Sequence, residues 1–302
     1  MKAKIVEYKP VKNYAFVFVC QEGDLEIMAV LLAASLKRNL RCEYELFAAI
    51  PRPQQKWGKP SQVTLKLLKQ MGVKIFPFYN NISVKFQADL YTNKAYCLRV
   101  PTKMDKIIYM DADMFCVREF FGEDRFSVPL NAKPEWRVFI KNWEEIYQAA
   151  GMKMPKTRFR STVTREFMPP FFNTGFFGID AKLAQAFSRE WLSCFKQIDK
   201  SGVMKDSFLK EPVSFVLSAQ KMGIQYDILD ERYNNTFLAN RHNFKPMPYF
   251  IHHFRLLKYL AKVPFVVKLV KTLQAEYPGI NNIKLSGNWQ LFFFILSNIK
   301  DK

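Results

Sequence analysis

The sequence contains no apolar run of the roughly 18 to 20 residues that a membrane-spanning helix needs, because lysines interrupt every candidate. It has five cysteines in 302 residues, and none of them forms a CxxC pair. We therefore expect neither a disulfide framework nor a cysteine-rich metal site, and we interpret the thiols as reduced core residues of a cytoplasmic protein. The first residues lead into a core-like strand without a small-residue cleavage site, so no signal peptide is expected. These absences favour a globular protein that is soluble or lies peripherally on a membrane.

Positive charge is what the chain has in excess. It holds 46 Lys and Arg against 27 Asp and Glu, a formal net charge of +19. Such an excess favours a polyanionic partner, which can be a phosphorylated substrate, anionic lipid headgroups or nucleic acid. The sequence has no zinc finger, RNP signature or Arg/Gly-rich tract, so we expect no specific nucleic-acid partner. A basic nucleic-acid-binding protein stays as an alternative that rests on the charge alone.

The order of predicted elements indicates an α/β fold. Short apolar runs alternate with segments of helical spacing, and a helical segment at 89–104 precedes an apolar strand that ends at Asp111. Strands are predicted at 15–20, 43–50 and 73–78, with helices at 25–40 and 61–71. Later come aromatic strand material from 171 to 180, helices at 181–198 and 211–222, and an extended run at 248–255. This alternation predicts a mostly parallel sheet flanked by helices, with right-handed crossovers.

Two carboxylates, Asp111 and Asp113, follow the strand at 106–110. Side chains at positions i and i+2 of an extended segment point the same way, so both carboxylates can converge on one ion. Hard oxygen ligands suit Mg²⁺ or Mn²⁺, and ligands of open α/β sheets bind beyond the carboxyl ends of the strands. A turn, where paired aspartates are common, is the alternative.

Taken together, these pieces resemble the GT-A nucleotide-sugar glycosyltransferases. The resemblance is greatest to the family 8 group, which includes glycogenin and the bacterial lipopolysaccharide galactosyl- and glucosyltransferases. Its motifs occur in the family's order over most of residues 14–258: a helix ending at 31–37, a lysine helix at Lys94, IYMDAD at 108–113, FNTG at 172–175, and a late strand with histidines.

The resemblance implies a metal site for the donor diphosphate. Asp111 and Asp113 would hold Mn²⁺ or Mg²⁺, completed by a histidine of the late strand. His252 stands six residues before Lys258, as the family's spacing requires, so we favour His252 and keep His253 in reserve. Lys258 would contact the donor phosphates.

Four further residues take roles from the same resemblance. Lys94 and Arg255 are candidates for phosphate contacts, or they lie on solvated basic helix faces. Asn173 would contact the donor sugar or the acceptor, or it is a turn residue. Glu211 would orient the sugar or act as a base, or it is a first-turn carboxylate favoured by the helix dipole. The chain departs from the family at 210–212, where the usual Asp-Gln or Asp-Glu pair is replaced by Lys-Glu-Pro, and after the histidines, where Gly-x-x-Lys-Pro-Trp is replaced.

The implied function is metal-dependent transfer of a hexose from a nucleoside diphosphate sugar, with a UDP-sugar favoured. The acceptor would be a hydroxyl group of a glycan or lipid-linked glycan. The resemblance favours retention of configuration, whereas Glu211 acting as a base would suit inversion. A degenerate protein that only binds nucleotide sugar is another alternative. A haloacid-dehalogenase-type phosphohydrolase is disfavoured, because its Asp-x-Asp normally stands near the chain start.

We expect a GT-A catalytic domain at 1–254 and a basic, aromatic, helical C-terminal extension at 255–302. Within the first, the Trp-rich and basic segment 131–168 is interpreted as an insertion or lid near the acceptor side, rather than as part of the sheet. In the extension, the basic amphipathic pattern at 255–273 fits either a helix on an anionic membrane surface or a helix packed on the catalytic domain with its lysines in water.

Overall fold

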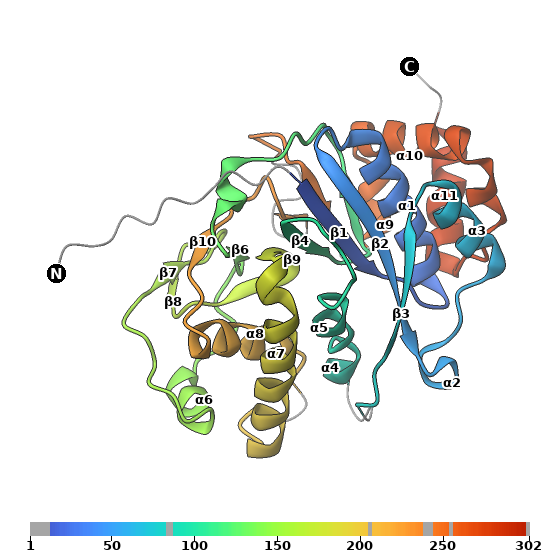
Figure 1. Cartoon of the computed structure of the whole chain (residues 1–302). Helices are drawn as coiled ribbons and strands as arrows, with labels where there is room; N and C mark the ends of the chain where they lie inside the picture. The colour runs from blue at the N-terminus through green and yellow to red at the C-terminus, as the bar shows by residue number, and fades with distance from the viewer. Residues whose placement is uncertain (1–12, 83–86, 205–206, 238–243, 254–255, 300–302) are drawn as a thin grey trace.

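A seven-stranded sheet forms the centre of the protein in the computed structural model, which describes residues 13–82, 87–204, 207–237, 244–253 and 256–299 (Figure 1). The strand order is β10-β6-β9-β4-β1-β2-β3. Neighbouring strands are parallel except at β9, which runs antiparallel to both β4 and β6. The strands are β1 (Asn13–Val19), β2 (Glu43–Arg52), β3 (Lys74–Tyr79), β4 (Lys106–Met110), β6 (Leu130–Pro134), β9 (Phe172–Asp180) and β10 (Tyr226–Ile228). The predicted α/β class with a mostly parallel sheet is confirmed.

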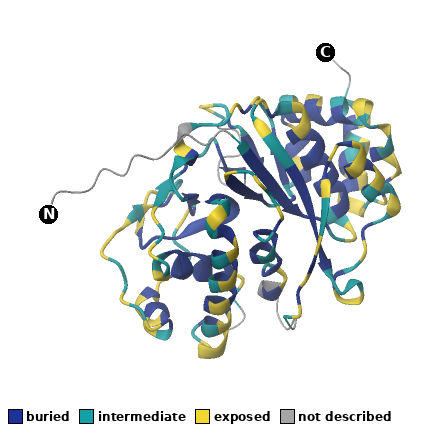
Figure 2. Cartoon of the chain, viewed as in Figure 1, coloured by how far each residue is buried: buried dark blue, intermediate teal, exposed yellow. Residues whose placement is uncertain are grey.

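Helices cover both faces of this sheet, because β1 is apolar on both sides. Its even-numbered residues from Tyr14 to Phe18 point into one core cluster and its odd-numbered residues from Ala15 to Val19 into another. The first cluster is completed by α1 (Asp24–Asn39) and the C-terminal helices, and the second by α7 (Ala181–Ser201) and α8 (Lys210–Lys221). Figure 2 shows the resulting buried interior on the strands and on the inward faces of the helices.

The remaining helices are short or lie near the chain ends. They are α2 (Gln54–Trp57), α3 (Gln62–Gln70), α4 (Gln87–Leu90), α5 (Asn93–Cys97), η1 (Asp124–Ser127), α6 (Trp143–Ala149), α9 (Leu257–Leu260), α10 (Pro264–Glu276), η2 (Pro278–Asn282) and α11 (Gly287–Asn298). The predicted strands and helices between 15 and 78 are confirmed with shifts of one or two residues at their ends. None of the helices in the part of the chain that the structure describes is long and apolar enough to cross a membrane.

The single helix predicted over 89–104 is wrong, because α4 ends at Leu90 and α5 begins at Asn93. The hydroxyl of Thr92 donates to the carbonyl of Asp89 at 2.6 Å, which satisfies a terminal carbonyl of α4. Pro101 then stands in an irregular segment that leads to β4. The break leaves Lys94 on a helix of its own, beside the end of β4.

The segment 131–168 is only partly separate from the sheet. Its first four residues belong to β6, which pairs with β9 and β10, so their prediction as part of an insertion is wrong. The strand escaped recognition because it contains two polar residues, Asn131 and Lys133, which are nevertheless fully buried. The rest contains α6 and the two-stranded pair β7 (Phe159–Arg160) and β8 (Phe167–Met168).

A small three-stranded sheet brings distant parts of the chain together. It consists of β5 (Met114–Cys116), β12 (Phe250–His252) and β11 (Asn235–Thr236), with β12 in the middle. Met114 pairs with His252 across the antiparallel β5–β12 ladder. Because β5 starts directly after Asp113, this register places the second carboxylate beside the histidine.

The C-terminal extension packs on the sheet domain. Helix α10 buries Val266, Val270 and Leu273 in the core cluster that α1 also lines, and Figure 1 shows the C-terminal helices beside α1 and α3. The structure thus supports the packed-helix interpretation of 255–273, with Lys262 and Lys268 exposed.

Candidate active site

Asp111, Asp113 and His252 meet where β4 ends. The His252 Nε2 atom lies 3.2 Å from Asp113 Oδ1 and 3.8 Å from Asp111 Oδ2. One ligand atom from each of the three residues lies within 4.8 Å of the other two. Two carboxylates and an imidazole form a donor set that fits Mn²⁺ or Mg²⁺. The two aspartates lie just after the carboxyl end of β4, where the sequence pattern predicts them. Strand β12 brings His252 to the same end of β4.

The two adjacent histidines have different surroundings. The ring of His253 stacks on Phe115 at a centroid distance of 5.2 Å and meets Trp289 edge to face. Its backbone N–H donates to the carbonyl of Asp113 at 3.0 Å. Neighbouring residues of a strand point to opposite sides, so only His252 is directed at the carboxylates. The structure therefore places the ring of His252, and not that of His253, beside the two carboxylates.

Asp111 is held by two buried donors. Lys94 Nζ lies 3.0 Å from Asp111 Oδ2, and the Tyr109 hydroxyl donates to Asp111 Oδ1 at 2.7 Å. Burial alone would lower the pKa of Lys94, but Asp111 and Glu211 outweigh it and keep that pKa above its ordinary value. Burial and the Asp111 charge raise the pKa of Tyr109, so its proton stays in place. Strand alternation from Asp111 back to Tyr109 could have identified this residue, which the sequence reasoning missed.

Glu211 lies beside Lys94 in the same buried group. Its Oε2 atom accepts a hydrogen bond from Thr174 at 2.9 Å and is 3.6 Å from Lys94 Nζ. Its Oε1 atom is buried and has no hydrogen-bond partner among the described residues. Burial raises the pKa of Glu211 to about 7, with Lys94 opposing and Asp111 adding to the rise. An unpaired buried carboxylate oxygen suits a ligand hydroxyl group.

The pKa of Asp113 is set by two opposing effects, burial and nearby positive charge. Burial raises its pKa, but His252, His253 and Lys94 together lower it by more, and the pKa ends well below its ordinary value. The carboxylate is therefore held ionised, which favours positive charge close to it. A divalent cation would satisfy the same requirement.

The remaining predicted site residues, Asn173, Lys258 and Arg255, differ in how they relate to the carboxylate cluster. Asn173 is buried and contacts Glu135 and Asn234 through its amide. Lys258 is exposed on α9 and, among the described residues, no hydrogen bond or ion pair joins it to the carboxylates. Arg255 lies outside the described residues.

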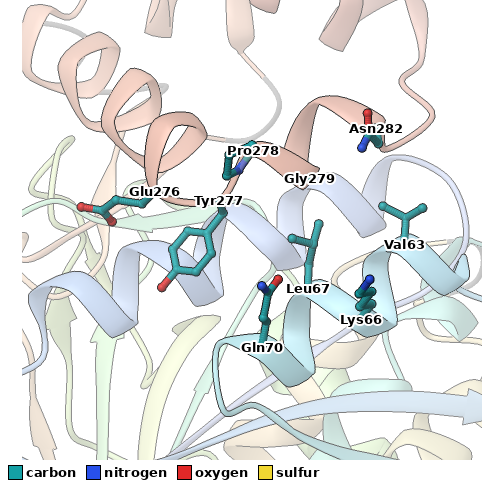
Figure 3. Close-up of a pocket in the computed structure, with 9 residues that line it drawn as sticks. All are labelled: Val63, Lys66, Leu67, Gln70, Glu276, Tyr277, Pro278, Gly279 and Asn282. Carbon is teal, nitrogen blue, oxygen red and sulfur yellow. The ribbon is translucent and has the colours of Figure 1, made fainter.

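A surface pocket of about 300 Å³ lies between α3 and the segment that joins α10 to η2 (Figure 3). Its lining, which includes Leu67, Tyr277 and Gly279, shares no residue with the Asp111 cluster. The pocket marks a packing seam of the C-terminal extension rather than part of the cluster.

An α/β sheet of this kind, with an Asp-x-Asp sequence at the end of its central strand, is consistent with a GT-A-like glycosyltransferase. The model of the Rhodobacterales glycosyltransferase domain matches residues 16–211, nearly two thirds of the chain. The chain belongs to this family. The match includes Lys94, Asp111, Asp113, Asn173 and Glu211 and ends before His252. None of the curated proteins compared with the chain matches it. The family supports glycosyl transfer but not the narrower specificity of the family 8 group.

Proposed function

We propose that this glycosyltransferase moves a hexose from a nucleoside diphosphate sugar, with a UDP-sugar favoured, to a hydroxyl group of a glycan or lipid-linked glycan. The observation that carries the proposal is the convergence of Asp111, Asp113 and His252 at the carboxyl end of β4. These three residues would hold Mn²⁺ or Mg²⁺, which supplies positive charge for the diphosphate of the donor. An ordinary turn would explain two aspartates but not the histidine that reaches them from a strand 139 positions further along.

Lys94 and Glu211 have separate roles in this proposal. Breaking the anomeric bond leaves negative charge on the diphosphate, and Lys94 provides a fixed cation beside the place where that charge develops. Glu211 Oε1 accepts a hydrogen bond from a hydroxyl group of the hexose and thereby orients the sugar. Retention of configuration remains a proposal from the resemblance. The anomeric configuration of the first product, read by proton NMR, distinguishes it from inversion.

The segment 135–168 is proposed to lie on the acceptor side of a catalytic unit formed by residues 1–254, with 255–302 as an extension. Asn173 Nδ2 of β9 donates to Glu135 Oε1 at 3.0 Å, which ties the start of the segment to the strand beside the site. Between 153 and 165 the chain carries five cations and no acid, and the described residues show no ion pair to any of them. A basic stretch of this kind at 153–165 suits an acceptor glycan that bears phosphate or carboxylate groups.

The function is tested by a melting-temperature panel of UDP-, GDP- and CMP-sugars, each with and without Mn²⁺, followed by turnover of the stabilising donor. A donor at a hundred times its Kd stabilises the folded state by about 2.7 kcal/mol, so we expect a rise of about 5 °C that requires Mn²⁺. Turnover is then measured with a neutral and a phosphorylated oligosaccharide, and we expect faster transfer to the phosphorylated one. Stabilisation by oligonucleotides instead of nucleotide sugars would contradict the function. Donor binding without transfer or donor hydrolysis would indicate a degenerate binding protein.

Peripheral binding to an anionic membrane is a second proposal, carried by the exposed face of α9 and α11. Tyr259, Leu291 and Phe294 are exposed by 37%, 41% and 66%, and Lys258 lies beside the first of them. Lys258, Tyr259 and Leu291 also line one surface pocket of about 160 Å³, so the two helices lie side by side. Exposed aromatic and aliphatic side chains next to lysines suit an anionic lipid surface.

We expect the protein to co-sediment with phosphatidylglycerol vesicles at low salt and to be released as salt rises, because each lysine near the surface contributes about 1 kcal/mol that ions screen. Leu291→Ser with Phe294→Ser should reduce the bound fraction several-fold. Phe121→Ser, at an exposed phenylalanine after β5, is the matched control. A wild-type protein that stays in the supernatant at low salt would contradict membrane binding.

A further inference from the structure

A line of four buried polar side chains ends at His252. Asn173 Nδ2 donates to Glu135 Oε1 at 3.0 Å, and Asn234 Nδ2 donates to Asn173 Oδ1 at 2.9 Å. Asn234 Oδ1 lies 3.2 Å from His252 Nδ1. All four side chains belong to residues that are at most 7% exposed. The sequence contains no signal for this line, because its members are separated by 18 to 61 positions along the chain.

The direction of every hydrogen bond in this line is fixed by one backbone amide. The N–H of Gly175 can only donate, and it lies 3.0 Å from Asn173 Oδ1, which identifies that atom as the oxygen. The Asn234 atom that faces the same oxygen must therefore be its nitrogen. It follows that Asn234 presents its oxygen to His252, so His252 Nδ1 carries a proton and donates it.

This arrangement determines which tautomer a neutral His252 adopts. With the proton on Nδ1, the lone pair on Nε2 faces Asp113 Oδ1 at 3.2 Å. A lone pair opposite a carboxylate is repulsive, and a cation bound between them turns the repulsion into coordination. Histidine ligands of metals are commonly oriented by such a hydrogen bond to the second ring nitrogen.

Gly175 makes the approach of the ring possible. A Cβ atom at this position would lie 2.4 Å from His252 Cε1 and 2.7 Å from Nδ1, so any larger residue would displace the ring. The carbonyl of Gly175 accepts the N–H of Asp111 at 2.7 Å. The Asn173 to Gly175 stretch of β9 thus fixes a carboxylate and the histidine together.

We propose that Asn234, oriented by Asn173, is a positioning residue that presents Nε2 of His252 to the divalent cation of the donor site. The inference rests on the proposed metal role of Asp111, Asp113 and His252. It replaces the expected contact of Asn173 with donor sugar or acceptor, because the Asn173 amide is already engaged by Glu135, Gly175 and Asn234.

The test measures Mn²⁺ affinity without any sugar, by the loss of the electron paramagnetic resonance signal of free Mn²⁺. Asn234→Ala should raise the Kd by roughly tenfold to a hundredfold, as for other residues that orient a metal ligand. Asn234→Asp keeps an oxygen acceptor opposite His252 Nδ1 but loses the donor to Asn173 Oδ1, so it should restore only part of the affinity. Asn235→Ala is the control, because it removes a neighbouring buried amide of the same size that is not part of the line.

Two results separate failure of this inference from failure of the metal site. If Asp113→Asn lowers Mn²⁺ affinity while folded Asn234→Ala binds as the wild type does, the positioning role is overturned. If Asp113→Asn also leaves the affinity unchanged, the metal site itself is wrong. Should Asn234→Ala fail to fold, ¹⁵N NMR of wild-type His252 at pH 8 decides directly. A proton on Nδ1 is expected, and a proton on Nε2 would overturn the inference.

Discussion

Asp113→Asn is expected to reduce Mn²⁺-dependent transfer by roughly a thousandfold, since losing a metal ligand removes several kcal/mol of charge stabilisation. Asp111→Asn should cause a similar loss. The measurement is the rate of nucleoside diphosphate release at saturating donor and acceptor, together with Mn²⁺ affinity. Both variants replace one charged carboxylate by a neutral amide in a set in which the three donor atoms lie within 4.8 Å of one another.

The two variants should differ in stability, and this difference tests whether Asp111 and Asp113 have the hydrogen-bond partners that the structure gives them. Asp111 accepts hydrogen bonds from Lys94 and Tyr109, so Asp111→Asn leaves a buried cation with weaker partners and should lower the melting temperature. Asp113→Asn disturbs mainly the pairing with His252 and should lower it less. Asp105→Asn, exposed before the other end of β4, is the control for both measurements. Full activity of either site variant would refute the metal role.

Sequence patterns over a few neighbouring residues were sufficient to predict the features that depend only on those neighbours. Alternation along β1 depends only on neighbouring residues, and the structure places its side chains as predicted. Asp111 and Asp113 come together as expected, but Ala112 and Asp113 lie in a turn rather than in an extended segment. The strand β6 was hidden by two buried polar residues, Asn131 and Lys133. Lys133 is stabilised by Glu231, 98 positions away. No local rule anticipates a buried lysine whose partner is so distant.

In the candidate site, too, some features follow from local sequence and others depend on contacts between distant residues. The family's spacing directed attention to Lys258, six residues after His252, yet Lys258 is exposed on α9. The cation that contacts Asp111 is Lys94, which reaches it because the predicted long helix is broken at residues 91–92. Asn234 and Glu135 reach the site only through the folding of the small sheet and β6. Burial and hydrogen-bond direction are properties of the folded chain, and the sequence pattern contains neither.

Glu211→Gln is expected to raise the stability of the metal-free protein at pH 8 by about 3 to 4 kcal/mol and to lower transfer. Burial raises the pKa of Glu211 from 4.5 to about 7, and a tenfold change in proton affinity corresponds to about 1.4 kcal/mol. The folded state binds this proton more tightly than the unfolded state does. The contribution of Glu211 to wild-type stability therefore falls as pH rises from about 4.5 and is fully lost above pH 7. The neutral amide carries no such penalty.

The comparison of melting temperatures in EDTA between pH 4.5 and 8 isolates this effect from other titrating groups, which the variant shares with the wild type. The two proteins should melt together at pH 4.5 and diverge as pH rises, while Glu145→Gln, at an exposed position of α6, should follow the wild type throughout. A constant offset across the range would mean that folding does not raise the pKa of Glu211. Higher stability combined with lower turnover would show that the buried carboxylate destabilises the fold where it serves the donor sugar, a cost expected at a catalytic position rather than at a helix terminus.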